Sequence, residues 1–392
     1  MKAGNDLLDV IGQAGDVRRV RIAVPEERLV DLLDRVRAAR VPPAQRGASW
    51  ESGADPAFLE RLRAYWLDGY DWRAHERRLN EFDHYLAPIE GRDLHFLHIR
   101  GRGPDPLPIL LPHGWPSTFL EMLRLIPLLT DGAESFDVVV PSLPGFGFSD
   151  PSDEPGYNFA RVADDLHTLM TKQLGYDRFG LHGGDIGAAT SGYLALNHGE
   201  SVVGVHLLDF AAPAPDLAPP APPLSDAERD YLDRRLAWSR SLGAYQIIQG
   251  TKPLKLAYAL NDSPLGLAAW LVEKYVAWSD TEDVLDSFSL DYLITTVCLY
   301  WFGESISPSM YYYYEHARTS PPDPGSRLVP PTGVAVTPDR PLHPQRRAPR
   351  EWLDRMHHVT QWRELSHGGH FASWEAPDEI AEALRDFFRP LR

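Results

Sequence analysis

The sequence predicts an α/β fold in which helices flank a mainly parallel β-sheet. The first observation is a set of short apolar runs rich in β-branched residues, at 94–99, 108–113, 137–142, 178–183 and 202–208. Helical stretches separate most of the later runs, as expected when strands buried on both faces of a sheet alternate with helices. Two further strand-like runs, at 333–336 and 358–365, follow a long helical interruption. The sheet is therefore expected to contain an insertion.

Helices are expected to cover this sheet at 117–129, 159–174, 187–199 and 379–389. The last of them, EIAEALRDFFR, has apolar residues on one face and charged residues on the other, as an amphipathic helix does. Strands and helices together predict one α/β core that is divided in the sequence into residues 93–210 and 327–392.

The segment before the core, residues 1–92, is expected to be a helical extension. Apolar residues recur at helical spacing within 21–43, and Pro42 ends that pattern. A second helical stretch covers 57–67, and LNEFDHYLAPI (79–89) is interpreted as a third helix before a tight turn.

The insertion, residues 211–326, is expected to form a helical lid. It begins with AAPAPDLAPPAPPLSD (211–226), whose proline content predicts a stiff connector. Ser225 and Glu228 then have the spacing of a capping box, which marks the start of a helix. The residues that follow are mostly helical in pattern and rich in Tyr, Trp and Leu, and SPPDPGS (320–326) returns the chain to the sheet.

Composition excludes several function classes. A net charge of −16 and the lack of a long lysine or arginine run argue against nucleic acid as a partner. Cys298 is the single cysteine, so no intramolecular disulfide and no multi-cysteine zinc site can form, which suits a reducing cytoplasm. No apolar run approaches the ~20 residues of a membrane span, and the N-terminus lacks the apolar stretch of a signal peptide. We expect a cytoplasmic protein without a membrane anchor, and a homodimer is left open.

Residues 180–190, GLHGGDIGAAT, connect a strand to a helix through a glycine-rich turn. Gly183, Asp185 and Gly187 match the GxSxG nucleophile elbow of α/β-hydrolases, except that aspartate replaces serine. Glycines flank the tip of such an elbow because neighbouring Cβ atoms would collide in so sharp a turn. The alternative is an ordinary strand-to-helix turn in which Asp185 caps the helix.

An aspartate at the tip favours attack on saturated carbon. Its carboxylate, with an ordinary pKa near ~3.9, is already charged at neutral pH and needs no base for the first step. Attack on an sp³ carbon forms an ester, which water can later cleave, whereas serine would form an inert ether. Asp185 therefore predicts opening of an epoxide or displacement of a halide.

Two further motifs fit around this nucleophile. PHGWPST (112–118) follows a strand where an oxyanion loop belongs, so the backbone N–H groups of Trp115 and Ile186 are expected to bind the oxyanion of the tetrahedral intermediate. SHGGHFASWEAPDEI (366–380) lies between the last strand and the last helix, and His370 is expected to be the base that activates water. His367, three residues earlier, is its competitor.

The acid that orients this base is less clearly marked. GVAVTPDRP (333–341) ends a strand with Asp339 in a turn, so Asp339 is the first candidate. Asp209, directly after the strand VVGVHLL, is the alternative.

These motifs resemble the epoxide hydrolases of the α/β-hydrolase fold, and specifically those similar to microsomal epoxide hydrolase, which have an N-terminal helical extension. The resemblance runs from about residue 21 to the C-terminus. It rests on YDWRAHERRLNEFDHY, HGWPSTFLEM, SLPGFGFSD, HGGDIGA, TKPLKLAYALNDSPLGLAAW, PTGVAV and GGHFASWEAP in that order. It implies that Asp185 is the nucleophile and His370 the base.

The resemblance also implies two lid tyrosines that bind the epoxide oxygen. Tyr245 in AYQIIQGTKP and Tyr313 in SMYYYYE stand at the matching places, and Tyr312 is the fallback within the tyrosine run. A phenol with an ordinary pKa of ~10 can donate a hydrogen bond or a proton to the alkoxide that ring opening creates. The sequence departs from its relatives after PTGVAV, where Arg340 occupies the position at which they usually have the acid.

The sequence thus predicts an epoxide hydrolase that converts a bulky hydrophobic epoxide to a vicinal diol, in detoxification or in secondary metabolism, with no cofactor and no metal. Haloalkane dehalogenase is the nearest alternative, but those enzymes usually have tryptophan directly after the nucleophile, where this chain has Ile186. A catalytically silent binding protein of the same fold is the other alternative. Ser191 lies inside the helix beyond the elbow, which argues against a serine esterase.

Overall fold

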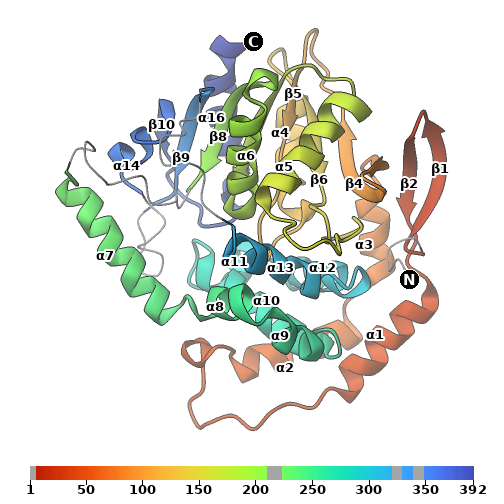
Figure 1. Ribbon diagram of the computed structural model, residues 1–392. Coiled ribbons are helices and arrows are strands. Elements are labelled where there is room, and N and C mark those ends of the chain that lie inside the picture. Colours follow the sequence, from red (N-terminus) through yellow and green to blue (C-terminus); the bar gives the residue numbers. More distant parts are fainter. Residues whose placement is uncertain (1–5, 210–222, 320–328, 339–347) are drawn as a thin grey trace.

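The structure is a computed structural model that describes residues 6–209, 223–319, 329–338 and 348–392 (Figure 1). One ten-stranded sheet runs through it in the order β1-β2-β3-β4-β6-β5-β7-β8-β9-β10. Its strands are β1 (Leu8–Ala14), β2 (Val17–Ile22), β3 (His84–Ile89), β4 (Arg92–Ile99), β5 (Leu107–Leu110), β6 (Phe136–Pro141), β7 (Phe179–Gly184), β8 (Val202–Leu208), β9 (Pro331–Val336) and β10 (His358–Glu364).

The strands from β5 to β10 form a continuous parallel half of the sheet. β6, β5, β7, β8, β9 and β10 pair in parallel in that order, and every residue of β6 and β8 is buried. Strands that are covered on both faces expose no side chains to solvent, which explains their nearly continuous apolar sequences. The predicted α/β-hydrolase fold with a largely parallel sheet is confirmed.

Helices cover both faces of this sheet (Figure 1). α5 (Phe159–Thr168) and α6 (Asp185–Asn197) pack together on one face, and α4 (Leu125–Thr130) and α16 (Pro377–Phe388) pack together on the other. The fit between layers is close, because a Cβ added at Gly180 of β7 would lie 2.6 Å from the Phe388 ring of α16. α5, α6 and α16 therefore lie within a few residues of their predicted positions, whereas the helix predicted at 117–129 is divided into η2 (Phe119–Met122) and α4.

The N-terminal segment is only partly helical, which corrects the expectation. α1 (Glu26–Ala38), α2 (Pro56–Asp68) and α3 (Trp72–Leu79) are present, but β1 and β2 form a hairpin that extends the sheet. The interpretation of 79–89 as a helix is wrong, because most of that stretch is β3. β3 pairs along its whole length with β4 across a two-residue turn, Glu90 and Gly91, in which both residues have positive φ. That turn and its partner strand outweigh the local helical pattern.

The predicted lid is helical in its described part, residues 223–319. Its helices are α7 (Asp226–Ser241), α8 (Ala244–Thr251), α9 (Pro253–Leu260), α10 (Pro264–Trp278), α11 (Val284–Ser287), α12 (Leu290–Phe302) and α13 (Ile306–His316). The capping box of Ser225 and Glu228 at the start of α7 is confirmed. α7 lies apart from the other lid helices, near α14 (Arg350–Asp354), and Arg355 forms an ion pair with Glu228 at 2.5 Å (Figure 1).

The extension packs against the lid. α1 and α2 contact α10, and α2 also contacts α12. The Tyr65 hydroxyl of α2 donates to Asp291 at 2.8 Å, and Arg28 of α1 donates to the carbonyl of Phe302 at 3.1 Å. The lid is thus held between the extension on one side and the sheet on the other (Figure 1).

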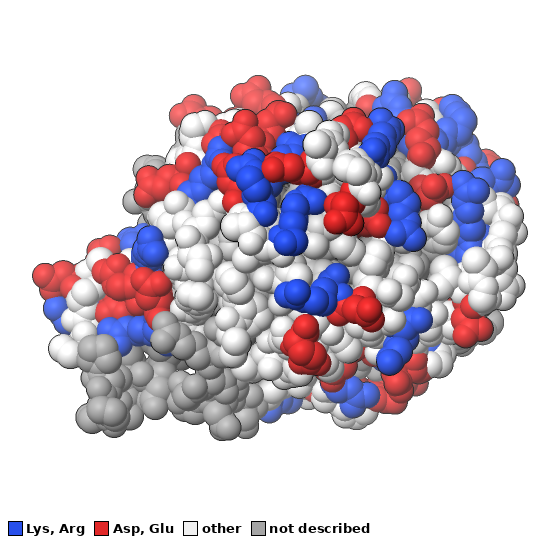
Figure 2. All heavy atoms as spheres, turned by 90° about the horizontal axis from the view of Figure 1, so that it is seen from above, with Lys and Arg blue, Asp and Glu red and all other residues white. Residues whose placement is uncertain are grey.

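The surface shows no concentration of one charge on the face in Figure 2, where lysine and arginine alternate with aspartate and glutamate. A nucleic-acid partner would need a positive stripe, so this face gives no support to one. Within the described residues, no helix has both the length and the hydropathy required to span a bilayer.

Candidate active site

The parallel strands of the sheet end at one edge, and the site residues follow those strand ends. The HGWP loop follows β5, Asp185 follows β7, Asp209 follows β8, and the loop of His370 follows β10. Ligands of parallel α/β sheets bind outside this carboxyl edge, because loops from several strands converge there. The topology therefore brings together residues that are far apart in the sequence.

Asp185 is at the tip of a nucleophile elbow. It is the first residue of α6 and has φ +51°, in the left-handed region that L side chains rarely adopt. Strain of this kind persists only where the surroundings hold it, and it occurs most often at functional sites. The carboxylate is 21% exposed, so it stays accessible while its backbone is fixed.

Glycines make this turn sterically allowed. A Cβ at Gly187 would lie 2.1 Å from the carbonyl oxygen of Pro112, and a Cβ at Gly183 would lie 2.7 Å from the carbonyl carbon of Gly187. A Cβ at Gly114, in the facing loop, would lie 2.5 Å from the Cβ of Asp185. The elbow and the HGWP loop are therefore in backbone contact and position each other.

The HGWP loop directs a backbone donor at the nucleophile. The N–H of Trp115 donates to Oδ1 of Asp185 at 2.9 Å. His113 fixes the loop from behind: Nδ1 lies 3.0 Å from the carbonyl oxygen of Gly114, and Nε2 accepts from the N–H of Leu143 at 3.2 Å. Burial lowers the pKa of His113 to about 4, so this histidine is neutral at pH 7 and suited to both bonds. Ile186 is the second residue of α6, where a helix leaves its N–H groups without intrahelical acceptors.

His370 approaches the other oxygen of the carboxylate. Its Nε2 is 3.9 Å from Oδ2 of Asp185, and its side chain is 9% exposed. The imidazole ring packs edge-on against Trp278, with 4.9 Å between ring centroids. This distance is longer than a direct hydrogen bond, so base and nucleophile are neighbours without being bonded.

Backbone hydrogen bonds hold the His370 loop in place. The His370 N–H donates to the carbonyl of Trp278 at 2.8 Å, and the Gly369 N–H donates to Glu375 of α15 (Ala372–Glu375) at 2.9 Å. Burial raises the pKa of Glu375. The competitor His367 lies on the surface, 54% exposed, with Nδ1 2.8 Å from Glu379. Only His370 of the two faces Asp185.

The acid partner of His370 is the least defined part of the site. Asp209 has φ +41° and accepts hydrogen bonds from the backbone N–H of Thr337, at 2.9 Å, and from the Thr337 hydroxyl. Its carboxylate thus joins the ends of β8 and β9. Asp339, the first candidate, lies outside the described residues, two positions beyond Thr337.

Tyr245 of α8 and Tyr313 of α13 meet over the HGWP loop. Their ring centroids are 6.0 Å apart, and both rings contact the Trp115 indole. Tyr245 stacks on this indole with ring planes 10° apart, and Tyr313 meets it edge-on. Since the Trp115 N–H binds Asp185, both phenols belong to the same site as the nucleophile.

The other tyrosines of the 311–314 run face elsewhere. The Tyr312 hydroxyl donates to the carbonyl of Pro144 at 2.9 Å in the interior, and Tyr311 and Tyr314 pack against each other. The structure therefore brings Tyr313, and not the fallback Tyr312, to the site. Ser191 is buried within α6, away from the tip of the elbow.

Sequence analysis misses several residues that surround the site. Trp278 contacts both His370 and Tyr245, and Lys274, also on α10, lies over the Tyr245 ring. Glu121 is buried behind the HGWP loop, and burial raises its pKa to about 8, with a further contribution from the charge of Asp185. Lys274 and Trp278 stand outside the motifs, and Glu121, although it belongs to HGWPSTFLEM, has nothing in its sequence context that marks it as buried. Only the folded chain could reveal their positions.

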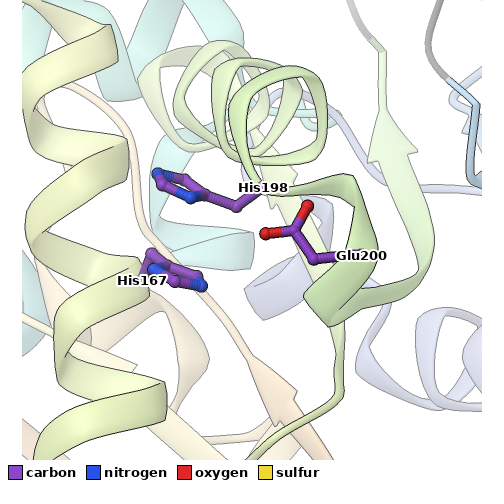
Figure 3. A group of neighbouring side chains, drawn as sticks. All are labelled: His167, His198 and Glu200. Atoms are coloured by element: carbon purple, nitrogen blue, oxygen red, sulfur yellow. The ribbon is translucent and has the colours of Figure 1, made fainter.

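Within the described residues, one group of side chains has the composition of a metal site (Figure 3). His167 of α5, His198 after α6, and Glu200 of η4 (Gly199–Ser201) have potential ligand atoms within 4.8 Å of one another. The two imidazole rings are stacked, 3.9 Å between centroids and 5° between planes. Parallel rings direct their lone pairs side by side, so a zinc ion at ~2.0–2.1 Å from each nitrogen would require both rings to tilt. The group lies at the opposite end of α6 from Asp185.

Comparison with known proteins agrees with this fold. A family profile described as epoxide hydrolase N terminus matches residues 17–122, and another described as alpha/beta hydrolase fold matches residues 108–328. The chain is 39% identical to a Stigmatella aurantiaca protein whose name places it among the epoxide hydrolases, over 95% of this chain and 84% of that protein. It is 31% identical to epoxide hydrolase 1 of Sus scrofa, over 95% and 88% of the two chains. The structure of Aspergillus niger epoxide hydrolase matches with a TM-score of 0.84 at 28% identity, over 100% of both chains.

Proposed function

The chain belongs to the epoxide hydrolase family of the α/β-hydrolase fold, and from this premise we propose that it opens its epoxide substrate through a covalent ester on Asp185. The observation that supports this most directly is the unequal environment of the two carboxylate oxygens. Oδ1 accepts the Trp115 N–H at 2.9 Å, whereas Oδ2 lies on the side of His370. The Trp115 N–H thus holds one carboxylate oxygen, and the second oxygen is the one next to the base.

In the first step Oδ2 of Asp185 attacks one carbon of the three-membered ring. The bond from that carbon to the ring oxygen breaks, and its electron pair stays on the oxygen. Tyr245 and Tyr313 donate hydrogen bonds to this oxygen, and one phenol gives it a proton, which leaves a hydroxyl group and a phenolate. The product of this step is a hydroxyalkyl ester of Asp185.

In the second step His370 removes a proton from water, and the hydroxide attacks the Cγ of the ester. The negative charge develops on Oδ1, where the N–H groups of Trp115 and Ile186 stabilise it. The bond between Cγ and the substrate oxygen then breaks, and this oxygen takes the second proton of the water to complete the diol. The carboxylate keeps the oxygen of water. The proton held by His370 restores the phenol, so the balance is one epoxide and one water to one diol.

We propose Asp339 as the acid that orients His370, with Asp209 as the alternative. Asp209 follows β8 at the catalytic edge, and Asp339 stands in the sequence three positions after the last residue of β9, the strand next to β8. Asp209 already accepts two hydrogen bonds from Thr337, which favours a structural role for it. The variants D339N and D209N separate the two, because loss of the partner should slow ester hydrolysis more than ester formation.

We further propose that the substrate is bulky and hydrophobic. Trp115, Tyr245, Trp278 and Tyr313 supply aromatic surface around Asp185, and aromatic rings at a site favour apolar ligands. A panel of aryl and alkyl epoxides tests this, with the expectation that kcat/KM rises with the apolar area next to the ring.

A cytoplasmic location and a homodimer remain predictions, to be checked by cell fractionation and by the mass of the purified protein in solution.

Isotope labelling in a single turnover tests the covalent mechanism. With enzyme in excess over styrene oxide in ¹⁸O water, the label should appear in the peptide 180–190 and not in the diol, since water attacks the carboxyl carbon. Label in the diol after one turnover would mean direct attack of water on the epoxide. The variant D185A should lose turnover completely.

A second experiment isolates the role of the base. H370Q should still form the ester but not hydrolyse it, so mass spectrometry should find a styrene oxide adduct on the peptide 180–190. H367Q is the matched control, because His367 lies nearby on the surface and should turn over normally. Normal turnover by H370Q, or an adduct that accumulates in H367Q instead, would reverse the assignment.

A further inference from the structure

A lysine is buried in the lid beside one of the two site tyrosines. Lys274, one turn before the end of α10, is 7% exposed. Its Nζ lies 4.6 Å from the centroid of the Tyr245 ring and 5.6 Å from that of Trp278. Lysine is almost never buried to this degree unless another group compensates its charge. The position of this ammonium group therefore calls for a physical reason.

Two kinds of group compensate the charge. Glu273, the preceding residue, forms an ion pair with Nζ, and its own side chain is 17% exposed. The face of the Tyr245 ring is the second, because the quadrupole of an aromatic ring attracts a cation above it. The ammonium and the phenol are thus coupled electrostatically, and each changes the energy of the other's charged form.

The surroundings of Tyr245 make this coupling strong. The ring is 4% exposed and stacks on Trp115, which is fully buried. In such a site the effective dielectric constant is well below that of water, so a charge a few ångströms away acts with little screening. Among the described residues, the charged or titratable groups around Tyr245 include Lys274 and Glu273 of α10 and Tyr313 of α13. Asp185 and His370 lie beyond the two indoles that contact the Tyr245 ring, Asp185 next to Trp115 and His370 next to Trp278.

We propose that Lys274 is a positioning residue that increases the acidity of the Tyr245 phenol and so makes Tyr245 the proton donor to the epoxide oxygen. This inference rests on the proposed function, in which the two lid tyrosines bind that oxygen. A cation over the ring stabilises the phenolate that remains after proton transfer and strengthens the hydrogen bond that the phenol donates before it. Tyr313 then acts as a hydrogen-bond donor without giving up its proton.

The proton balance supports a transient phenolate next to a permanent cation. Tyr245 loses its proton when the ring opens, and His370 takes a proton from water only in the second step. Between these two events Tyr245 is a phenolate. The positive charge of the Lys274 ammonium, which lies over the ring, stabilises this negative charge. When ester hydrolysis is complete, the proton on His370 returns the phenol to its neutral form.

The test measures ester formation with styrene oxide in single turnovers, for wild type, K274M, K274R, Y245F and the double variant Y245F/K274M. K274M should slow ester formation about tenfold, consistent with a desolvated cation–π contact, and K274R should recover most of the rate because it keeps the charge. In the Y245F background K274M should have no further effect on this step. K255M, which removes an exposed lysine of the same lid, is the matched control and should behave as wild type.

The pH dependence of kcat/KM gives a second readout, in which two variants should shift the profile in opposite directions. E273Q removes the negative partner of Lys274, so the alkaline limb of kcat/KM should move to lower pH, whereas K274M should move it to higher pH. A merely structural role for Lys274 predicts a lower rate with no movement of this limb, and that result would overturn the inference. So would equal slowing by K274M in the wild-type and Y245F backgrounds. If Y245F itself forms the ester at the wild-type rate, the role of Tyr245 in the proposed function fails instead.

Discussion

The elbow and the lid hold their functional side chains in different ways. Around Asp185 the backbone does the positioning, through a strained φ, glycines in steric contact and the hydrogen bond from Trp115. In the lid, packed rings hold Tyr245 and Tyr313 against Trp115. Where the backbone positions a side chain, an atom added nearby must displace the backbone. Where packed rings position it, a single hydroxyl can be removed without disturbing the packing. This difference sets where substitutions should be severe and where they should be informative.

The largest effect is expected from one added methyl group at the elbow, in G114A. The new Cβ would lie 2.5 Å from the Cβ of Asp185, so the HGWP loop must shift and move the Trp115 N–H away from the carboxylate. Loss of one oxyanion donor typically costs ~10²–10³ in kcat. Steady-state kinetics with styrene oxide should show this loss. G192A is the control, because a Cβ at Gly192 of α6 meets open space. A G114A variant with more than a third of wild-type kcat would contradict the claim that backbone contact sets this geometry.

The next effect separates two adjacent tyrosines of the lid. Y313F should slow ester formation by ~10²-fold, the lower range for loss of one hydrogen-bond donor to a developing oxyanion, with little change in stability. Y312F should do the opposite. It loses the buried hydrogen bond to Pro144, so the free energy of unfolding should fall by about 1 kcal/mol while the rate of ester formation stays unchanged. Urea unfolding and single-turnover kinetics on both variants check this, and a swap of the two phenotypes would show that the register of α13 is misassigned.

The same contrast explains what the sequence could predict. The elbow is recognisable because a sharp turn demands glycines at fixed positions, and the HGWP and His370 loops are recognisable because they follow strands of a parallel sheet. The core strands are predictable for a related reason, since continuous apolar runs have few other uses. Backbone requirements leave a direct trace in the sequence.

Side-chain packing leaves a weaker trace. In a run of four tyrosines on a helix each side chain points ~100° from the last, and nothing in the residue types says which one faces the site. Lys274 is harder still, because a lysine on a lid helix is expected to face solvent. The misassigned stretch 79–89 shows the same limit, since its partner strand β4 and the turn at Glu90 decide its conformation.

A third prediction concerns acid, which should destabilise the fold through two buried histidines of the sheet. His84 and His95 are buried in β3 and β4 with 2.9 Å between Nδ1 and Nε2, and burial lowers the pKa of His84 to about 4 and that of His95 well below its ordinary value. Both are neutral in the folded state, whereas the unfolded chain takes up protons below pH 6.5. The stability they contribute is thus complete above pH 6.5 and is lost as pH falls towards 4.

The magnitude is about 1 kcal/mol per histidine for each pH unit in that window. Urea unfolding between pH 7 and pH 4.5 should show this slope, and H84Q should reduce it. H358Q is the control, since His358 at the start of β10 is exposed. Equal slopes for H84Q and wild type would mean that other groups cause the acid sensitivity.

The smallest effect on activity should come from the buried Glu121. Burial raises its pKa to about 8, above the 4.5 of the unfolded chain, and the charges of Asp185 and Glu375 raise it further while a hydrogen bond from Ser117 opposes them. A group whose pKa is raised on folding costs stability as pH rises from 4.5 to 8, because the folded state keeps a proton that the unfolded state has released.

E121Q removes this cost. It should match wild type in the free energy of unfolding near pH 5 and exceed it at pH 9, while ester formation at pH 6 stays within about twofold, since a neutral carboxyl and an amide are alike at that pH. Urea unfolding at the two pH values is the measurement. A stability difference that is the same at both would mean that Glu121 is ionised in the folded protein, and the backbone of the HGWP loop would then depend on a buried charge as well as on its glycines.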